Sequence, residues 1–237
     1  MTKLMYLSLA IMAGMFISCS PTYYVPNTQN VSMLSEQGDF SGNLAGNIDQ
    51  LEVQAAYAVS DHIGIMANTG FFFPKDEENG SGGSGNLFEG GIGYFTPIGD
   101  EGFLFETFGL VGVGNVENHF TTRDDGKTHG DLKAGLFRAA IQPAISFKSK
   151  YFSASASSRL AYLNYTSVSG DLIYHDVDQI NYLKENNTQM LIEPAITLRG
   201  GIDVVKLQVQ LGTSLNLTDP DFRQGSNYIT AGLHFTL

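Results

Sequence analysis

The chain has 237 residues, a formal charge of −11 and a single cysteine. This length fits one all-β domain better than two domains. The acidic balance and the absence of any basic stripe in the sequence exclude a nucleic-acid-binding surface. One cysteine also excludes an internal disulfide framework, so stability must come from packing and strand pairing.

Residues 1–18 read M-T-K-L-M-Y-L-S-L-A-I-M-A-G-M-F-I-S. Lys3 gives a short positive start, and residues 4–17 form an apolar run too short to cross a bilayer as a helix. The run ends on Phe16-Ile17-Ser18-Cys19, which resembles a bacterial lipobox, although Phe16 stands where leucine is usual. We therefore expect residues 1–18 to be a lipoprotein signal peptide and Cys19 to be the lipid attachment residue.

Residues 19–37 show no hydrophobic periodicity and contain two prolines, Pro21 and Pro26. Neither a helix nor a central strand accommodates such a segment. We expect it to be an N-terminal tether between the lipid and the folded domain.

From residue 38 onward, strand-like runs alternate with connections that are short at one end and long at the other. A period of two in the hydrophobicity predicts a strand with one apolar and one polar face. We predict ten strands, over residues 38–46, 50–59, 62–73, 86–96, 103–116, 131–147, 151–166, 189–199, 204–217 and 227–237. If residues 38–59 lie outside the sheet, the number is eight.

The strand from residue 204 shows the two faces most clearly. Val205, Leu207 and Val209 alternate with Lys206 and Gln208. Across the predicted strands the polar face is rich in glycine, serine and glutamine and poor in lysine, unlike the solvated surface of a β-sandwich. No apolar run after residue 17 is long enough for a membrane helix. The pattern therefore predicts an all-β fold, a closed antiparallel up-and-down transmembrane β-barrel with its apolar face outward.

Charged residues recur on the face that should point into the barrel. Four acids and four bases lie there, which are Glu52, Glu89, Glu106, Glu193, Arg138, Arg159, Arg199 and Lys206. A buried charge is costly unless it is paired and hydrogen-bonded. We therefore expect a charge network that plugs the lumen, with Arg159 bonded to Glu193 on the next strand. Arg138 is expected to reach Glu106 or Glu52.

The chain ends in T-A-G-L-H-F-T-L. Thr230, Gly232, Phe235 and Leu237 in this run resemble the C-terminal insertion signal of outer-membrane β-barrels. With the leader and the strand pattern, residues 38–237 resemble the family of small OmpA-, OmpX- and OmpW-like barrels, here in lipoprotein form. The resemblance implies a bacterial outer-membrane location, contact with outer-membrane lipid and with the barrel-assembly machinery, a lipid anchor at Cys19 and both chain termini on the periplasmic side.

The sequence contains no spacing typical of a nucleophile elbow, a zinc motif or a calcium loop. We expect no catalytic residue, no metal site and no cofactor. The function expected is that of a non-enzymatic barrel with a plugged or very narrow polar lumen, in a structural or surface-interaction role. The alternatives are a narrow channel for small solutes and an enzyme acting at the outer rim, where His119, His129 and His175 are the candidates.

Overall fold

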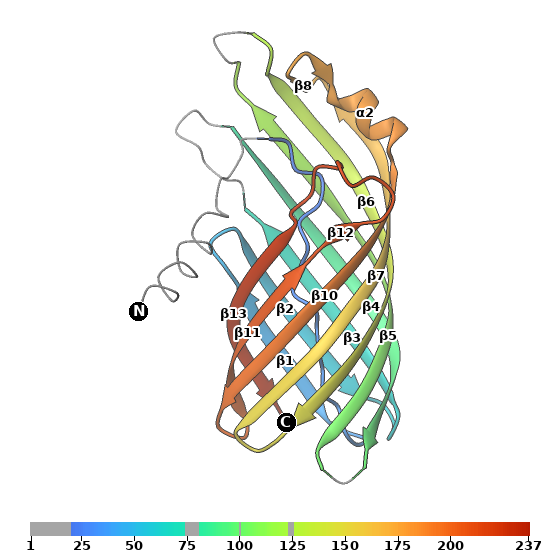
Figure 1. Cartoon of the computed structure of the whole chain (residues 1–237), viewed down its shortest axis with the longest axis vertical. Coiled ribbons are helices and arrows are strands. Elements are labelled where there is room, and N and C mark those ends of the chain that lie inside the picture. The colour runs from blue at the N-terminus through green and yellow to red at the C-terminus, as the bar shows by residue number, and fades with distance from the viewer. Residues whose placement is uncertain (1–19, 74–80, 100, 123–125) are drawn as a thin grey trace, which may run out of the picture.

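The computed structural model describes residues 20–73, 81–99, 101–122 and 126–237. Ten antiparallel strands in this part of the chain close into a barrel (Figure 1). Their bounds are β1 Phe40–Gly46, β2 Gln50–Ala58, β3 Ile63–Phe72, β4 Gly82–Ile98, β5 Phe103–Phe120, β6 Gly130–Lys148, β7 Phe152–Gly170, β10 Thr188–Gly201, β11 Val205–Thr213 with β12 Leu215–Asn216, and β13 Asn227–Thr236. We count β11 and β12 as one wall strand because both pair with β10.

The barrel closes because its first and last strands pair. β1 pairs with β2 on one side and with β13 on the other, and β13 also pairs with β11. The prediction of ten strands is therefore confirmed, and the eight-stranded alternative is wrong, since β1 and β2 are both part of the wall. Closure gives every wall strand two neighbours, although the loop-end residues of β4 and β13 pair on one side only.

The two ends of the barrel differ. At one end, which we call the turn end, adjacent strands are joined by short turns such as the one between β6 and β7. At the other, the loop end, β4 to β7 project beyond their neighbours (Figure 1). These four strands have 17 to 19 residues, well above the ~10 that cross a bilayer at a typical tilt.

The longest predicted loop, residues 167–188, is partly ordered into regular structure. It holds a small hairpin of β8 (Ile173–Tyr174) with β9 (Val177–Asp178), followed by the helix α2 (Gln179–Glu185). The Asp178 carboxylate caps α2 by accepting bonds from the backbone N–H groups of Ile180 (2.9 Å) and Asn181 (3.1 Å). A helix of seven residues is too short for its periodicity to be detected in the sequence.

Within the described residues, no helix combines the length and apolar character needed to cross a membrane.

The barrel wall is apolar outside, and its inner face carries polar and charged side chains together with three buried apolar clusters, one of which joins Phe95, Phe108 and Leu110. Along β2, Leu51 and Val53 are exposed while Glu52 and Gln54 are buried. The same alternation continues around the wall, as period-two patterning requires. Apolar side chains more than two-fifths exposed on the outer face include Leu51, Val53, Ile65, Phe88, Ile92, Val111, Val113, Ile141, Ile145, Ile196, Val209, Leu211 and Ile229.

Aromatic side chains gather on the outside near both ends. Near the turn end Phe103 packs on Phe147, with ring centroids 5.3 Å apart. Towards the loop end Phe71 meets Phe88 edge to face at 5.9 Å. Two such groups are typical of the aromatic girdles that border the apolar band of a membrane barrel.

The two ends of the described chain lie at opposite ends of the barrel (Figure 1). The Leu237 N–H donates to the Phe40 carbonyl at the turn end. Thr22 instead bonds Asn118, near the loop-end limit of β5. The expectation that both termini lie at the same end is therefore wrong for the start of the described chain. That expectation followed from the even number of strands. An even number places the start of the first strand and the end of the last strand at the same end, but it does not fix the path of the residues before the first strand.

We predict that Val209→Arg lowers the free energy of unfolding by about 2–4 kcal/mol, because Val209 lies mid-strand on the outer face, where lipid would meet a charge. The measurement is a denaturant titration of the protein refolded into lipid vesicles. Ile98→Arg, at the last residue of β4, is the matched control and should cost at most about 1 kcal/mol. Equal costs at both sites would contradict the assignment of the faces.

Candidate functional site

The candidate site is the lumen, and its main occupant is the chain's own N-terminal segment. Residues 22–34, which we call the luminal segment, run along the inside of the barrel from the loop end to the turn end (Figure 1). Most of their side chains are buried, among them Tyr23, Tyr24 and every residue from 26 to 34. Residues 22–34 of the expected tether therefore lie inside the barrel, whereas Glu36 and Gln37 are exposed.

The luminal segment has almost no secondary structure of its own. The one β-bridge that it forms is isolated and joins Tyr24 to Gln224. A buried backbone still needs hydrogen-bond partners, and the side chains of the wall supply them. The Gln210 side chain is bidentate on Gln29, accepting from its N–H (2.7 Å) and donating to its carbonyl (2.9 Å).

Two buried carboxylates bind N–H groups of the segment. Glu106 accepts from the N–H groups of Ser32 and Met33, both at 2.9 Å, and from the Ser32 hydroxyl at 2.8 Å. Glu52 accepts from the Thr28 N–H at 3.0 Å. Both acids therefore bind the segment instead of pairing with a base.

Long polar side chains bind the segment's carbonyl groups. They come from several strands of the wall, so the segment is held from several sides at once. The bonds run from Gln54 to the Thr28 carbonyl (2.7 Å), from Arg159 to Asn27 (3.1 Å), from Gln142 to Asn30 (2.9 Å) and from Arg199 to Val31 (2.6 Å).

Two buried ion pairs join strands on the inner face of the wall. The pair expected from the sequence is present, with Arg159 Nε 2.6 Å from Glu193 Oε2. Arg138 pairs with Glu89 at 2.6 Å, so the expectation of Glu106 or Glu52 as its partner was wrong. The reason is Gly112, which lies between Glu89 and Arg138 in the register and has no side chain to separate them. A Cβ at Gly112 would lie 2.5 Å from Glu89.

The predicted charge residues therefore do not form one network. All eight are buried, but they divide into two ion pairs, two acids that hold the segment, and two bases. The bases, Arg199 and Lys206, have no carboxylate within 4.0 Å in the described part of the chain. The material that fills the lumen is the luminal segment, and the charges fix it in place.

Aromatic side chains pack together inside the barrel at the loop end. Tyr23 packs on Phe222 with ring centroids 5.6 Å apart, and its hydroxyl donates to Gln179 of α2 at 2.6 Å. The Tyr24 hydroxyl accepts from Arg138 at 2.6 Å. Above them, burial and the neighbouring Asp219 carboxylate raise the pKa of Tyr182, so that its phenol stays protonated and donates to Asp219 (3.2 Å).

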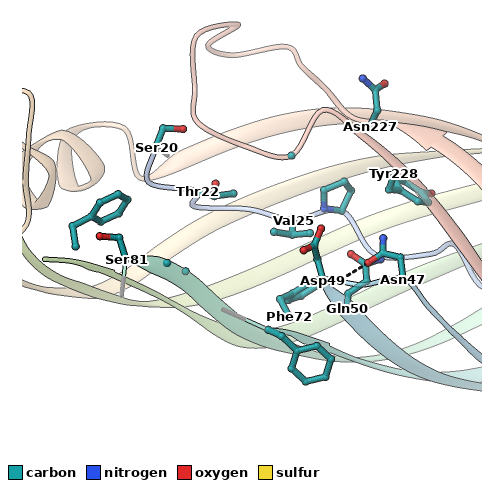
Figure 2. Close-up of a pocket in the computed structure, with 16 residues that line it drawn as sticks. Ser20, Thr22, Val25, Asn47, Asp49, Gln50, Phe72, Ser81, Asn227 and Tyr228 are labelled. Atoms are coloured by element: carbon teal, nitrogen blue, oxygen red, sulfur yellow. Dashed lines mark hydrogen bonds between the residues drawn. The ribbon is translucent and has the colours of Figure 1, made fainter. Parts of the chain in front are cut away.

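A cavity of 220 Å³ lies beside the luminal segment at the loop end (Figure 2). The segment forms one wall of it, and the ends of β2, β3, β4, β5 and β13 with the β1–β2 turn form most of the rest. Its lining mixes apolar and aromatic side chains with polar groups and one acid, and includes Thr22, Val25, Asn47, Asp49, Gln50, Phe72, Ser81, Asn227 and Tyr228. Two of its lining residues are fixed by hydrogen bonds, since the Tyr228 hydroxyl donates to Gln210 (2.9 Å) and the Thr22 N–H donates to Asn118 (2.9 Å).

The structure describes the four residues of the predicted C-terminal signal but not Cys19. Thr230 points inward, where its hydroxyl bonds that of Thr28 (2.9 Å), and Leu237 is 77% exposed. Gly232 lies against β1, since a Cβ there would meet the Leu44 carbonyl at 2.2 Å. Phe235 lies on β13, and Cys19 lies outside the described residues.

The histidines considered for rim chemistry lie near the loop end. His119 on β5 contacts the Asp131 carboxylate on β6, and both side chains are more than half exposed. Across the described residues, no cluster of three histidine, cysteine or acidic side chains is placed to hold a metal ion.

We predict that Arg159→Met lowers the free energy of unfolding by about 3–5 kcal/mol, because it leaves the Glu193 carboxylate buried without its partner. Denaturant titration of the detergent-solubilised chain measures this. Lys133→Met removes a cation from an exposed pair with Glu117 and should cost at most about 1 kcal/mol. A small cost for Arg159→Met would mean that water screens the pair.

No family model matches the chain, and no curated protein matches it. Among solved structures, the chain is similar to the KdgM porin (TM-score 0.37, 9% identity, 83% of this chain and 98% of that chain covered). It is also similar to LpxR from Salmonella typhimurium (0.34, 9%, 84% and 99%). A third similarity is to a loop L8 deletion mutant of OmpT, an outer membrane protein of Vibrio cholerae (0.28, 8%, 84% and 97%). At these values the barrel assignment rests on this chain's own strand pairing.

Proposed function

We propose that the chain is a non-enzymatic outer-membrane β-barrel lipoprotein whose lumen is closed by its own N-terminal segment, with a structural or surface-interaction role. The observation that carries this proposal is the burial of residues 26–34 inside the barrel, with their backbone bonded to side chains of the wall. A lumen held in this way leaves no continuous path for a solute.

The outer surface supports the membrane location. Water-soluble monomers rarely expose apolar patches above a few hundred Å². Here the apolar outer face continues around the whole wall, with aromatic groups near both ends. Lipid is the environment that such a band requires. Outer-membrane lipid and the barrel-assembly machinery are accordingly the partners we propose, and membership of the OmpA-, OmpX- and OmpW-like group is part of the same proposal.

The path of the luminal segment bears on the lipid anchor. Ser20 follows Cys19 directly and lies at the loop end. Long loops face the outside of the cell in bacterial outer-membrane barrels. A lipid on Cys19 would then enter the outer leaflet and not the periplasmic one expected from the sequence.

A passive channel is the alternative that the lumen argues against most directly. A ten-stranded barrel is slightly wider than one that side chains alone can fill. In this chain the additional width is taken up by a peptide, so conduction would require the luminal segment to leave.

We predict that the wild-type protein shows no steady conductance in planar bilayers. Deleting residues 23–33 should produce stable channels, because the remaining linker is too short to pass through the lumen. Heat-modifiable gel mobility would show that the deletion variant still forms a barrel. Wild-type conductance equal to that of the deletion variant would refute the closed lumen.

We predict that an epitope inserted between Ser20 and Pro21 is bound by antibody on intact cells, whereas the same epitope after Leu237 is bound only after the outer membrane is permeabilised. The two insertions test the opposite ends of the barrel. As a control, the first variant should incorporate a palmitate analogue and its Cys19→Ala derivative should not. Binding of both epitopes only after permeabilisation would contradict the threaded orientation.

A further inference from the structure

The loop-end cavity of 220 Å³ extends from the start of the described chain to the rim at which the short strands β1 to β3 meet the loop end (Figure 2). Ser20 and Thr22 line one end of it, and Asn47 and Gln50 line the other. Ser20 directly follows Cys19, the residue expected to carry a lipid. A group attached to Cys19 is therefore one residue away from the lining of the cavity.

The inner end of the cavity lies at the level of the loop-end aromatic side chains. Gln50 and Phe72, which both line it, are opposite one another on β2 and β3. Phe71, the residue before Phe72, points outward and packs on Phe88. Aromatic side chains of this kind lie at the membrane–water interface, where the polar and apolar parts of a lipid meet. The cavity is therefore at the depth of a lipid's glyceryl group.

Large apolar side chains are exposed on the outside of this rim. Phe73, which also lines the cavity, is 47% exposed, and Ile48 in the β1–β2 turn is 91% exposed. The rim is low here, since β1 to β3 have 7 to 10 residues whereas β4 to β7 have 17 to 19. An acyl chain that leaves the cavity past Phe73 would thus enter the apolar band of the outer face directly.

The charge of the lining favours a neutral ligand. Among the described residues that line the cavity there is no lysine, arginine or histidine, and Asp49 is an acid. Phosphate groups are bound by cationic side chains or by several N–H donors, and a carboxylate repels them. The diacylglyceryl group that a bacterial lipoprotein carries on its cysteine is joined through a thioether and has no charge. The lining therefore suits this group better than the head group of a phospholipid.

We propose that the cavity holds the glyceryl group of the lipid carried by Cys19, with the acyl chains passing over Phe73 into the outer leaflet. At about 30 Å³ for each group of the size of a water molecule, the volume of 220 Å³ holds roughly seven such groups. This is enough for the glyceryl unit and the first carbon atoms of its chains. The inference rests on the proposed function, because it requires both the lipid anchor and its position at the loop end.

The test is photo-crosslinking of the full chain in cells supplied with a palmitate analogue. The analogue carries a photoreactive diazirine near its carboxyl group and an alkyne at its tail. After illumination, mass spectrometry identifies the peptide that the lipid joins to the Cys19 peptide. We expect this peptide to contain Phe72 and Phe73 or residues 47–50, since these line the cavity at the rim.

Thr22→Trp places a bulky side chain in the cavity and should lose this crosslinked product while Cys19 keeps its label. Thr166→Trp is the matched control, because Thr166 is an exposed threonine of β7 outside the lining, and it should keep the product. Heat-modifiable gel mobility shows that each variant still forms a barrel.

The outcomes separate the inference from the proposed function. Absence of label on Cys19 would overturn the lipid anchor and this inference with it. Label on Cys19 without a product at the rim, or with the same product in Thr22→Trp, would overturn the inference alone. A third arm uses Cys19→Ala, exported behind a signal peptide that adds no lipid. Crosslinks at the rim of this variant equal to those of the wild type would mean that a bilayer lipid occupies the cavity, which also contradicts the inference.

Discussion

The backbone of the luminal segment must find hydrogen-bond partners inside a lumen that has no free strand edge. A closed barrel pairs all of its own backbone groups, so a chain passing through it cannot join the sheet. Apart from the backbone bonds of Tyr23 and Tyr24 to Arg223 and Gly225, side chains of the wall serve its N–H and carbonyl groups. This requirement explains why the inward face carries glutamines, arginines and glutamates beside its apolar clusters.

The size of the barrel sets the second condition. Ten strands enclose more space than side chains alone fill, and several inward positions have small side chains, including Ser153, Ser155 and Ser157. The extended luminal segment fits this space, and its side chains occupy the volume that its backbone leaves. The ion pairs Arg159–Glu193 and Arg138–Glu89 then lie in contact with the segment, because Arg159 also bonds Asn27 and Arg138 also bonds Tyr24.

Much of the wall could be predicted from the sequence, because a period of two is a local signal. The alternation of Leu207 and Val209 with Lys206 and Gln208 determines which side chains point outward without any knowledge of the neighbouring strands. Pairing between adjacent strands is nearly as local, which is why Arg159 and Glu193 could be matched. The partner of Arg138 is not on an adjacent strand. Glu89 lies two strands away, and the contact depends on Gly112, which lies between the two residues and has no side chain.

The position of residues 20–37 could not be predicted from local pattern. An extended segment held by side chains has no periodicity, and its prolines and polar residues are equally typical of an exposed linker. The strand register supplies the signal that the sequence alone lacked. Neither Glu52 nor Glu106 is opposite a base on a neighbouring strand, and a buried acid with no cation requires other donors. Those donors are the N–H groups of Thr28, Ser32 and Met33.

Hydrogen–deuterium exchange of the amides in residues 27–33, measured in detergent by mass spectrometry, tests the central claim most directly. The N–H groups of Thr28, Gln29, Ser32 and Met33 are each bonded to a buried side chain of the wall. If the segment fills the lumen, these amides exchange as slowly as those of β5 and β6. Exchange as fast as that of an unstructured peptide would place the segment outside the barrel and contradict the account.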